Sequence, residues 1–81
     1  MFKDIKFAKN FEHINKKIGA KIANMRKKKS YSQEKFAEKV NISTIYLGEI
    51  ERGEANPTLD KLKAIANALD VELCELFNFS F

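Results

Sequence analysis

The chain has 81 residues, 44% of them hydrophobic, and a formal net charge of +4. A chain of this length buries one small core, so we expect a single compact domain. No apolar run approaches the length needed to span a bilayer. Lysines interrupt the N-terminus where a signal peptide needs a continuous apolar segment, so we expect a cytoplasmic protein with no membrane partner.

Metal chemistry and catalysis have little support in the sequence. The single cysteine, Cys74, can form no internal disulfide and has no Cys or His neighbours at the spacing of a zinc site. His13 follows Glu12, but no nucleophile or second acid accompanies the pair at a recognisable spacing. We therefore expect no metal, no cofactor, no small-molecule substrate and no enzymatic activity.

Positive charge is concentrated in the N-terminal third. Residues 1–29 contain ten Lys or Arg and two acidic residues, a net charge of +8, whereas residues 30–81 contain five and nine, a net charge of −4. A basic excess agrees with a nucleic-acid partner, because lysines and arginines neutralise phosphates and release counterions. A solvated helix face explains the same charges equally well.

The first helix is predicted from the recurrence of apolar residues. Residues 1–10 show little periodicity and are either a basic arm or an additional helical turn. From Phe11 onward, apolar residues recur every three or four positions until the helix fades through Arg26 to Lys29, where positive charge is favourable. The apolar residues of this helix are Phe11, Ile14, Ile18, Ile22 and Met25.

Two short helices joined by a tight turn are predicted between Ser32 and Gly53. Ser32 can cap the first, which ends near Val40, and Ser43 can cap the second. Asn41 tolerates the left-handed backbone that a tight turn needs, and Gly53 supplies the positive φ that commonly follows a helix end. The apolar residues on the inner side of the two helices are Phe36, Ala37, Leu47 and Ile50.

The C-terminal part predicts two further helices. Thr58 can cap a fourth helix, and a short fifth helix should span about 71–77 with Leu73, Leu76 and Phe77 facing inward. We therefore expect five helices in one all-α domain. The apolar stripe of the fourth helix is Leu59, Leu62, Ile65, Ala66 and Leu69.

Three segments together resemble the Cro and phage-repressor type of helix-turn-helix domain. They are SQEKFAEKV, STIYLGEIERG and NPTLDKLKAIANALDVELCELF, in that order. The resemblance covers about residues 13–77 and implies a helix-turn-helix domain there, between an N-terminal segment, 1–12, and a tail, 78–81. It implies a five-helix, lambda-repressor-like fold with the helix-turn-helix at helices 2 and 3. The Tyr46-Leu47 pair and the Glu51-Arg52-Gly53 ending most resemble small single-domain regulators, including restriction-modification controller proteins.

The resemblance implies a double-stranded DNA partner and a set of contacting residues. The recognition helix corresponds to about 43–52 and would lie in the major groove. Positions that face base edges correspond to Thr44, Ile45 and Glu49, with Tyr46 lying against the DNA and Ser43 at the helix start. Positions that approach the phosphate backbone correspond to Ser32, Gln33, Arg52, Asn56 and Thr58.

The same resemblance implies a structural ion pair between Arg26 and Glu51, which would join the first helix to the end of the third. Because both charges would be largely buried, the loss of either partner would cost about 3 to 5 kcal/mol.

The base-reading positions differ from those of many relatives, which carry Arg or Gln there. Thr44 and Ile45 favour methyl contacts with thymine, and Glu49 can accept a hydrogen bond from cytosine N4 or instead orient Arg52 or a water. Lys35 replaces the Glu of a capping box. Gly48 costs about 1 kcal/mol of helix propensity relative to Ala, which suggests that something approaches the backbone closely.

An apolar cluster near the C-terminus is too rich to lie wholly in water, and the resemblance implies that it forms a homodimer. The resemblance implies a two-fold interface through the fifth helix, which would place two recognition helices about 34 Å apart. An intramolecular core could absorb part of this cluster. The residues concerned are Val71, Cys74, Phe77, Phe79 and Phe81.

Two functions remain open at the level of sequence. The first is a sequence-specific transcriptional regulator that binds a palindromic operator as a homodimer. The alternative is an antitoxin-like or adaptor module that keeps the fold but binds a protein, which the acidic residues Glu49, Glu51 and Glu54 favour. Salt dependence separates them, because binding through several phosphates weakens steeply as salt rises.

Overall fold

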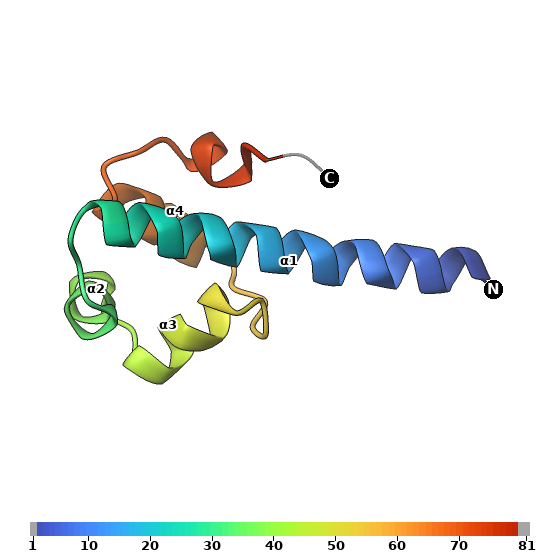
Figure 1. Ribbon diagram of the computed structural model, residues 1–81, viewed down its shortest axis with the longest axis horizontal. Coiled ribbons are helices and arrows are strands. Elements are labelled where there is room, and N and C mark those ends of the chain that lie inside the picture. Colours follow the sequence, from blue (N-terminus) through green and yellow to red (C-terminus); the bar gives the residue numbers. More distant parts are fainter. Residues whose placement is uncertain (1, 80–81) are drawn as a thin grey trace.

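The computed structural model describes the backbone of residues 2–79 and the side chains of residues 13–79. This part of the chain contains four α-helices and one short 3-10 helix, which confirms the expected all-α class (Figure 1). The short fifth helix expected at about 71–77 is a 3-10 helix of five residues, so the described residues contain four α-helices where five helices were expected. The elements are α1 (Phe2–Lys28), α2 (Gln33–Val40), α3 (Thr44–Glu51), α4 (Leu59–Ala68) and η1 (Leu73–Phe77).

Helix α1 is the longest element and runs through the middle of the molecule. Figure 1 shows its N-terminal part extending beyond the other helices, with α2 and α3 on one side of α1 and η1 on the other. The sequence left the N-terminal residues as either a basic arm or an additional helical turn. The backbone is helical from Phe2 onward. The expected packing of Phe11 and the contribution of Phe81 lie outside the described residues.

Three helices begin with the predicted hydroxyl caps. The side-chain oxygens of Ser32, Ser43 and Thr58 each accept a hydrogen bond from the backbone N–H three residues later, at 3.0 to 3.1 Å. Each cap satisfies one of the backbone donors that a helix start leaves without a partner. The boundaries of α2, α3 and α4 therefore follow directly from short local signals.

All four α-helices end in the same way. A residue with left-handed backbone follows each helix, and the next amide donates to the carbonyl five positions earlier, at 2.8 to 3.1 Å. This is the Schellman arrangement. The sequence predicts it at Asn41 and Gly53, but not at Ser30 and Asp70, because Ser and Asp adopt this conformation less often than Gly and Asn.

The core lies where α1, α2, α3 and α4 meet, and most of the predicted apolar stripes reach it. Leu59 and Phe77 were expected to face inward, but they are 60% and 40% exposed. Leu59 is the first residue of α4, while in η1 the neighbouring Leu76 occupies the buried position. The buried apolar residues are Ile18, Ile22, Phe36, Ala37, Val40, Leu47, Ile50, Leu62, Ile65, Ala66, Leu69 and Leu76.

A glycine in α1 allows α3 to pack closely against it, and no local sequence pattern predicts this contact. A Cβ atom at Gly19 would collide with the carbonyl oxygen of Ile50 and would lie 2.7 Å from that of Glu51. Because the clash would be with backbone, no side-chain rotation could relieve it. Gly19 therefore sets the distance between α1 and the end of α3.

Candidate nucleic-acid interface

Helix α3 presents different residues to the core and to solvent. Leu47, Gly48 and Ile50 are buried, whereas Thr44 is exposed and Ile45 is 76% exposed. The outward direction that the sequence assigned to Ile45 is therefore correct. An isoleucine this exposed loses the free energy that burial of an apolar side chain normally provides.

The side chain of Tyr46 lies between the core-facing and the solvent-facing sides of α3. It is half-buried and packs against the hydrophobic core, so only part of its ring is available to a partner. Ile45, Glu49 and Arg52 are spaced four and three residues apart and lie along one side of the helix. That side forms the candidate interface.

The cap hydroxyls retain one useful hydrogen bond each. The oxygen of each hydroxyl already accepts a hydrogen bond from the backbone N–H three residues later, but the hydroxyl proton is still available for donation. A phosphate oxygen is a pure acceptor and would match that proton. The cap positions Ser32, Ser43 and Thr58 can therefore serve both the helix and a phosphate.

A buried ion pair holds the end of α3 against α1. Arg26 donates from Nε to Glu51 Oε2 at 2.7 Å and from Nη2 to Oε1 at 3.1 Å, and the two side chains are 7% and 6% exposed. Arg26 Nη1 also donates to the carbonyl oxygen of Tyr31 at 2.7 Å. The bidentate geometry and the third bond compensate these buried charges.

Gln33 belongs to the same network. Its Nε2 donates to Glu51 Oε1 at 2.8 Å, which links the start of α2 to the end of α3. The structure thus gives Gln33 a role within the fold, in addition to the backbone contact that the resemblance implies. The spacing of 18 residues between Gln33 and Glu51 gives no local sequence signal for this bond.

An exposed ion pair lies just beyond α3. Arg52 donates from Nε and Nη2 to the two carboxylate oxygens of Glu54 at 3.0 and 3.1 Å, and these side chains are 58% and 56% exposed. The hydrogen bond from Arg52 lowers the pKa of Glu54, and the same bond raises the pKa of Arg52. The resemblance did not imply this pairing of Glu54 with Arg52.

The close approach to the backbone at Gly48 comes from the same arginine. A Cβ atom at Gly48 would lie 3.0 Å from Arg52 Nη1, so the group that approaches this backbone is the guanidinium of Arg52. The close approach that the sequence suggested at Gly48 is thus internal to α3 and its end.

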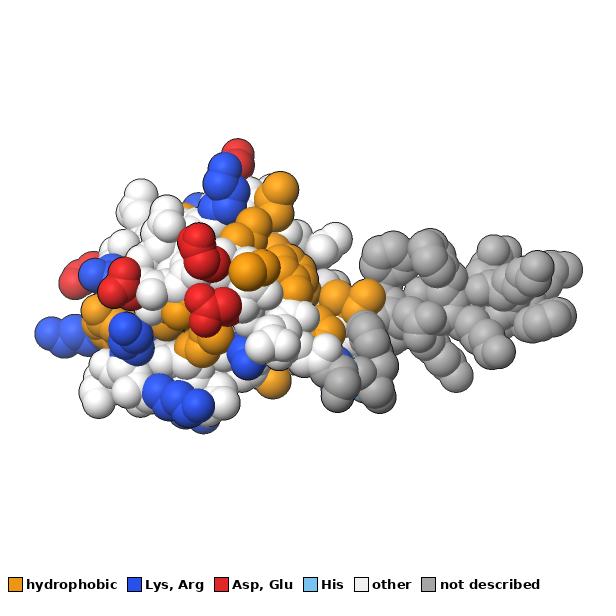
Figure 2. All heavy atoms as spheres, turned by 90° about the horizontal axis from the view of Figure 1, so that it is seen from above, with side chains coloured by type: hydrophobic (Ala, Val, Ile, Leu, Met, Phe, Trp, Pro, Cys, Tyr) orange, Lys and Arg blue, Asp and Glu red, His pale blue; other side chains and the backbone are white. Residues whose placement is uncertain are grey.

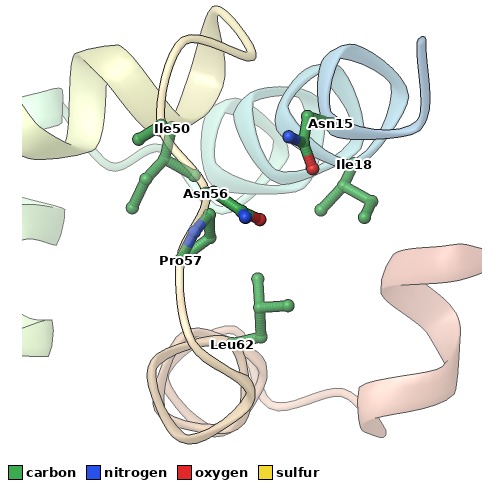
Figure 3. A pocket seen from close by; sticks show the side chains of 7 residues that line it. Asn15, Ile18, Ile50, Asn56, Pro57 and Leu62 are labelled. Atoms are coloured by element: carbon green, nitrogen blue, oxygen red, sulfur yellow. The ribbon is translucent and has the colours of Figure 1, made fainter. Parts of the chain in front are cut away.

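Asn56 lies away from the outer side of α3. Figure 3 shows its side chain beside a pocket of about 100 Å³ between α1, the loop after α3 and α4. Asn15 and Ile18 of α1 and Leu62 of α4 also line this pocket. Asn56 is exposed, so its amide can still reach solvent from the rim of the pocket.

The residues predicted to form a dimer interface lie near η1. Cys74 is exposed, Phe77 is partly exposed, and Val71 and Phe79 are half-buried and packed against the core. Lys17 of α1 places its ammonium group 6.0 Å from the centre of the Phe79 ring. Figure 2, which looks onto the side that bears η1, shows hydrophobic and acidic side chains gathered there.

Residues 13–79 hold no group of three or more His, Cys, Asp or Glu side chains placed to bind a metal ion. Among the described residues, no helix combines the length and hydropathy needed to cross a bilayer.

Comparison with known proteins identifies the family. A family model described as Helix-turn-helix matches residues 22–76, which is more than half of the chain. The chain therefore belongs to the helix-turn-helix family.

Relatives include phage repressors and controller proteins. The immunity repressor protein of Bacillus phage phi105 is 41% identical over 56 residues, which is 69% of this chain and 39% of that protein. Control protein C.BamHI of Bacillus amyloliquefaciens is 38% identical over 64 residues, covering 78% of this chain and 79% of that protein. Several curated relatives are longer, and the chain spans only 39% to 56% of their length.

The fold also matches a solved controller protein. The crystal structure of the restriction-modification controller protein C.AhdI from Aeromonas hydrophila gives a TM-score of 0.74 at 37% identity. That match covers 76% of this chain and 94% of the controller protein. The resemblance to this type of helix-turn-helix protein, which the sequence predicted, is confirmed.

Proposed function

We propose that this protein is a DNA-binding transcriptional regulator whose helix α3 enters the major groove. The observation that carries this proposal is the exposed start of α3, where Thr44 and Ile45 project from a helix anchored to the core. A helix held rigidly by Leu47, Ile50 and the Arg26–Glu51 pair loses little conformational freedom on binding.

The chemistry of the residues on the outer side of α3 favours particular base contacts. The methyl groups of Thr44 and Ile45 suit thymine, and the carboxylate of Glu49 suits the amino group of cytosine. Ser32, Ser43 and Thr58 can donate their hydroxyl protons to phosphate oxygens, as can the amide of Asn56 and the guanidinium of Arg52. Gln33 contributes chiefly by holding Glu51.

We further propose a homodimer on a palindromic operator. The proposed dimer surface is formed by residues in and next to η1, and η1 lies on the other side of α1 from α3 (Figure 1). Its residues are Val71, Cys74, Phe77 and Phe79. A second copy could occupy that side without blocking α3. Two-fold pairing would favour an operator with two half-sites about one DNA turn apart, on the order of 34 Å.

Selection from a random pool of duplex DNA tests the base-reading assignment. The wild-type protein should enrich a defined sequence, and Thr44→Ala and Glu49→Ala should each change the preferred base at one position of each half-site. Asn67→Ala, on the exposed side of α4, serves as the control and should enrich the wild-type sequence. Unchanged preferences in both α3 variants would refute the assignment.

A protein-binding adaptor is the second candidate, and one observation favours it. The group formed by Glu49, Arg52 and Glu54 carries a net negative charge at the end of α3, which opposes contact with phosphates. Titration with duplex DNA at increasing salt separates the two functions. Affinity that falls steeply with salt supports the regulator, whereas no binding at low salt supports the adaptor.

A further inference from the structure

The ion pair that follows α3 is placed by the fold and is not an incidental surface contact. The Schellman turn at Gly53, with φ of 77°, returns the chain so that the amide of Glu54 bonds to the carbonyl of Glu49 at 2.8 Å. This turn brings the Glu54 carboxylate beside Arg52. On its other side, the guanidinium lies against Gly48, where an added Cβ atom would be 3.0 Å from Arg52 Nη1.

Arg52 lies on the side of α3 proposed to meet DNA, yet its charge is already neutralised. Both carboxylate oxygens of Glu54 are bound, one to Nε and one to Nη2. The pair as a unit carries no net charge and offers a phosphate little electrostatic attraction. An exposed pair of this kind is also weak, because water and salt screen it, so a phosphate can replace the carboxylate.

We propose that Glu54 is an internal competitor of DNA phosphate: its carboxylate occupies Arg52 in the free protein and lowers the affinity for DNA. Arg52 becomes a phosphate contact when the carboxylate gives way. Glu54 thereby sets how tightly the protein binds DNA of any sequence, while Thr44, Ile45 and Glu49 set which sequence is preferred. This inference rests on the proposed DNA-binding function.

The decisive comparison is a double-mutant cycle of Glu54→Gln and Arg52→Gln, measured on the full chain. The probe is the duplex enriched by the wild-type protein, together with an unrelated duplex of equal length. Glu54→Gln should bind both duplexes about two- to fivefold tighter at moderate salt, as expected for the release of an exposed ion pair. Its plot of log K against log salt should be steeper, by up to about one unit, because Arg52 is then free to contact a phosphate in every bound molecule.

The Arg52→Gln background shows whether Glu54 acts through Arg52. There, Glu54→Gln should give little gain, because no guanidinium remains to be released. A full gain in that background would mean general removal of negative charge and would overturn the proposal. Glu38→Gln, an equal charge change at an exposed position of α2, should show no coupling to Arg52.

The remaining outcomes separate this inference from the function on which it rests. Thermal unfolding should be almost unchanged in the cycle, since both side chains are more than half exposed. Unchanged affinity and salt slope in Glu54→Gln, with normal binding by the wild type, would overturn only the role of Glu54. Absence of salt-dependent DNA binding in every variant would overturn the proposed function and this inference together.

Discussion

The two sides of α3, a helix of eight residues, differ in their surroundings: the inner side packs against the rest of the protein and the outer side faces solvent. On the inner side, Leu47 and Ile50 are buried and Glu51 is bound to Arg26, so each position is fixed by its neighbours. On the outer side, Thr44 and Ile45 have few neighbours within the protein. Substitutions on the inner side should therefore change folding stability, and those on the outer side should change binding.

The largest effect on stability is expected at the buried ion pair. Glu51→Ala leaves the charge of Arg26 buried without its bidentate partner, so the free energy of unfolding should fall by about 3 to 5 kcal/mol. Urea unfolding followed by circular dichroism measures this change. A domain of this size has limited stability to lose, so the unfolding is measured at low temperature.

The matched control for Glu51→Ala is Glu54→Ala, which removes the same side chain from an exposed pair three residues later. Its midpoint of urea unfolding should stay within experimental error of the wild type. Similar losses in the two variants would contradict the distinction between the inner and outer sides of this region.

The next largest effect is expected at Gly19, where α1 and α3 approach most closely. Gly19→Ala should lower the free energy of unfolding by about 3 kcal/mol, because the added methyl group collides with backbone carbonyls and forces the helices apart. Ala has the better helix propensity, so a loss of stability can come only from packing. A stability equal to or above that of the wild type would show that the two helices can separate without cost.

The proposed dimer surface near η1 should also respond to substitution in binding and not in folding. Phe77→Ala should weaken self-association by about tenfold, because an aromatic side chain is lost from the proposed interface, and should change the monomer fold little. Sedimentation at several protein concentrations measures the effect. Leu59→Ala, at an even more exposed apolar residue, is the control and should leave the dimer intact. A monomeric wild type would refute the homodimer.

Local sequence signals predicted much of the fold, and non-local contacts account for what they missed. Hydroxyl caps and apolar periodicity located α2, α3 and α4, because both signals act within one or two helical turns. The buried positions of Leu47 and Ile50 followed from the same spacing. The prediction that Leu59 faces inward was wrong, because periodicity alone does not show that the first residue of a helix lies beyond the edge of the core.

The candidate site was less predictable than the fold. The outward direction of Ile45 follows from helical geometry, but the partners of Gln33 and Gly19 are set by segments distant in sequence. The pairing of Arg52 with Glu54 is local, yet it depends on a turn that returns the chain after Gly53. A pattern of residue types gives no information on which of several nearby carboxylates an arginine will bind.

The smallest effect is expected at Gly48, the glycine that belongs to both sides of α3. Gly48→Ala gains about 1 kcal/mol of helix propensity. Its Cβ atom would meet only the flexible end of Arg52, at 3.0 Å, so the arginine can move aside and most of that gain should appear in urea unfolding. The same movement disturbs the Arg52–Glu54 pair, so the salt slope of DNA binding should shift while the preferred sequence stays the same. A loss of stability would instead mean that the position of Arg52 supports the fold, and the division between the two sides of α3 would fail at this residue.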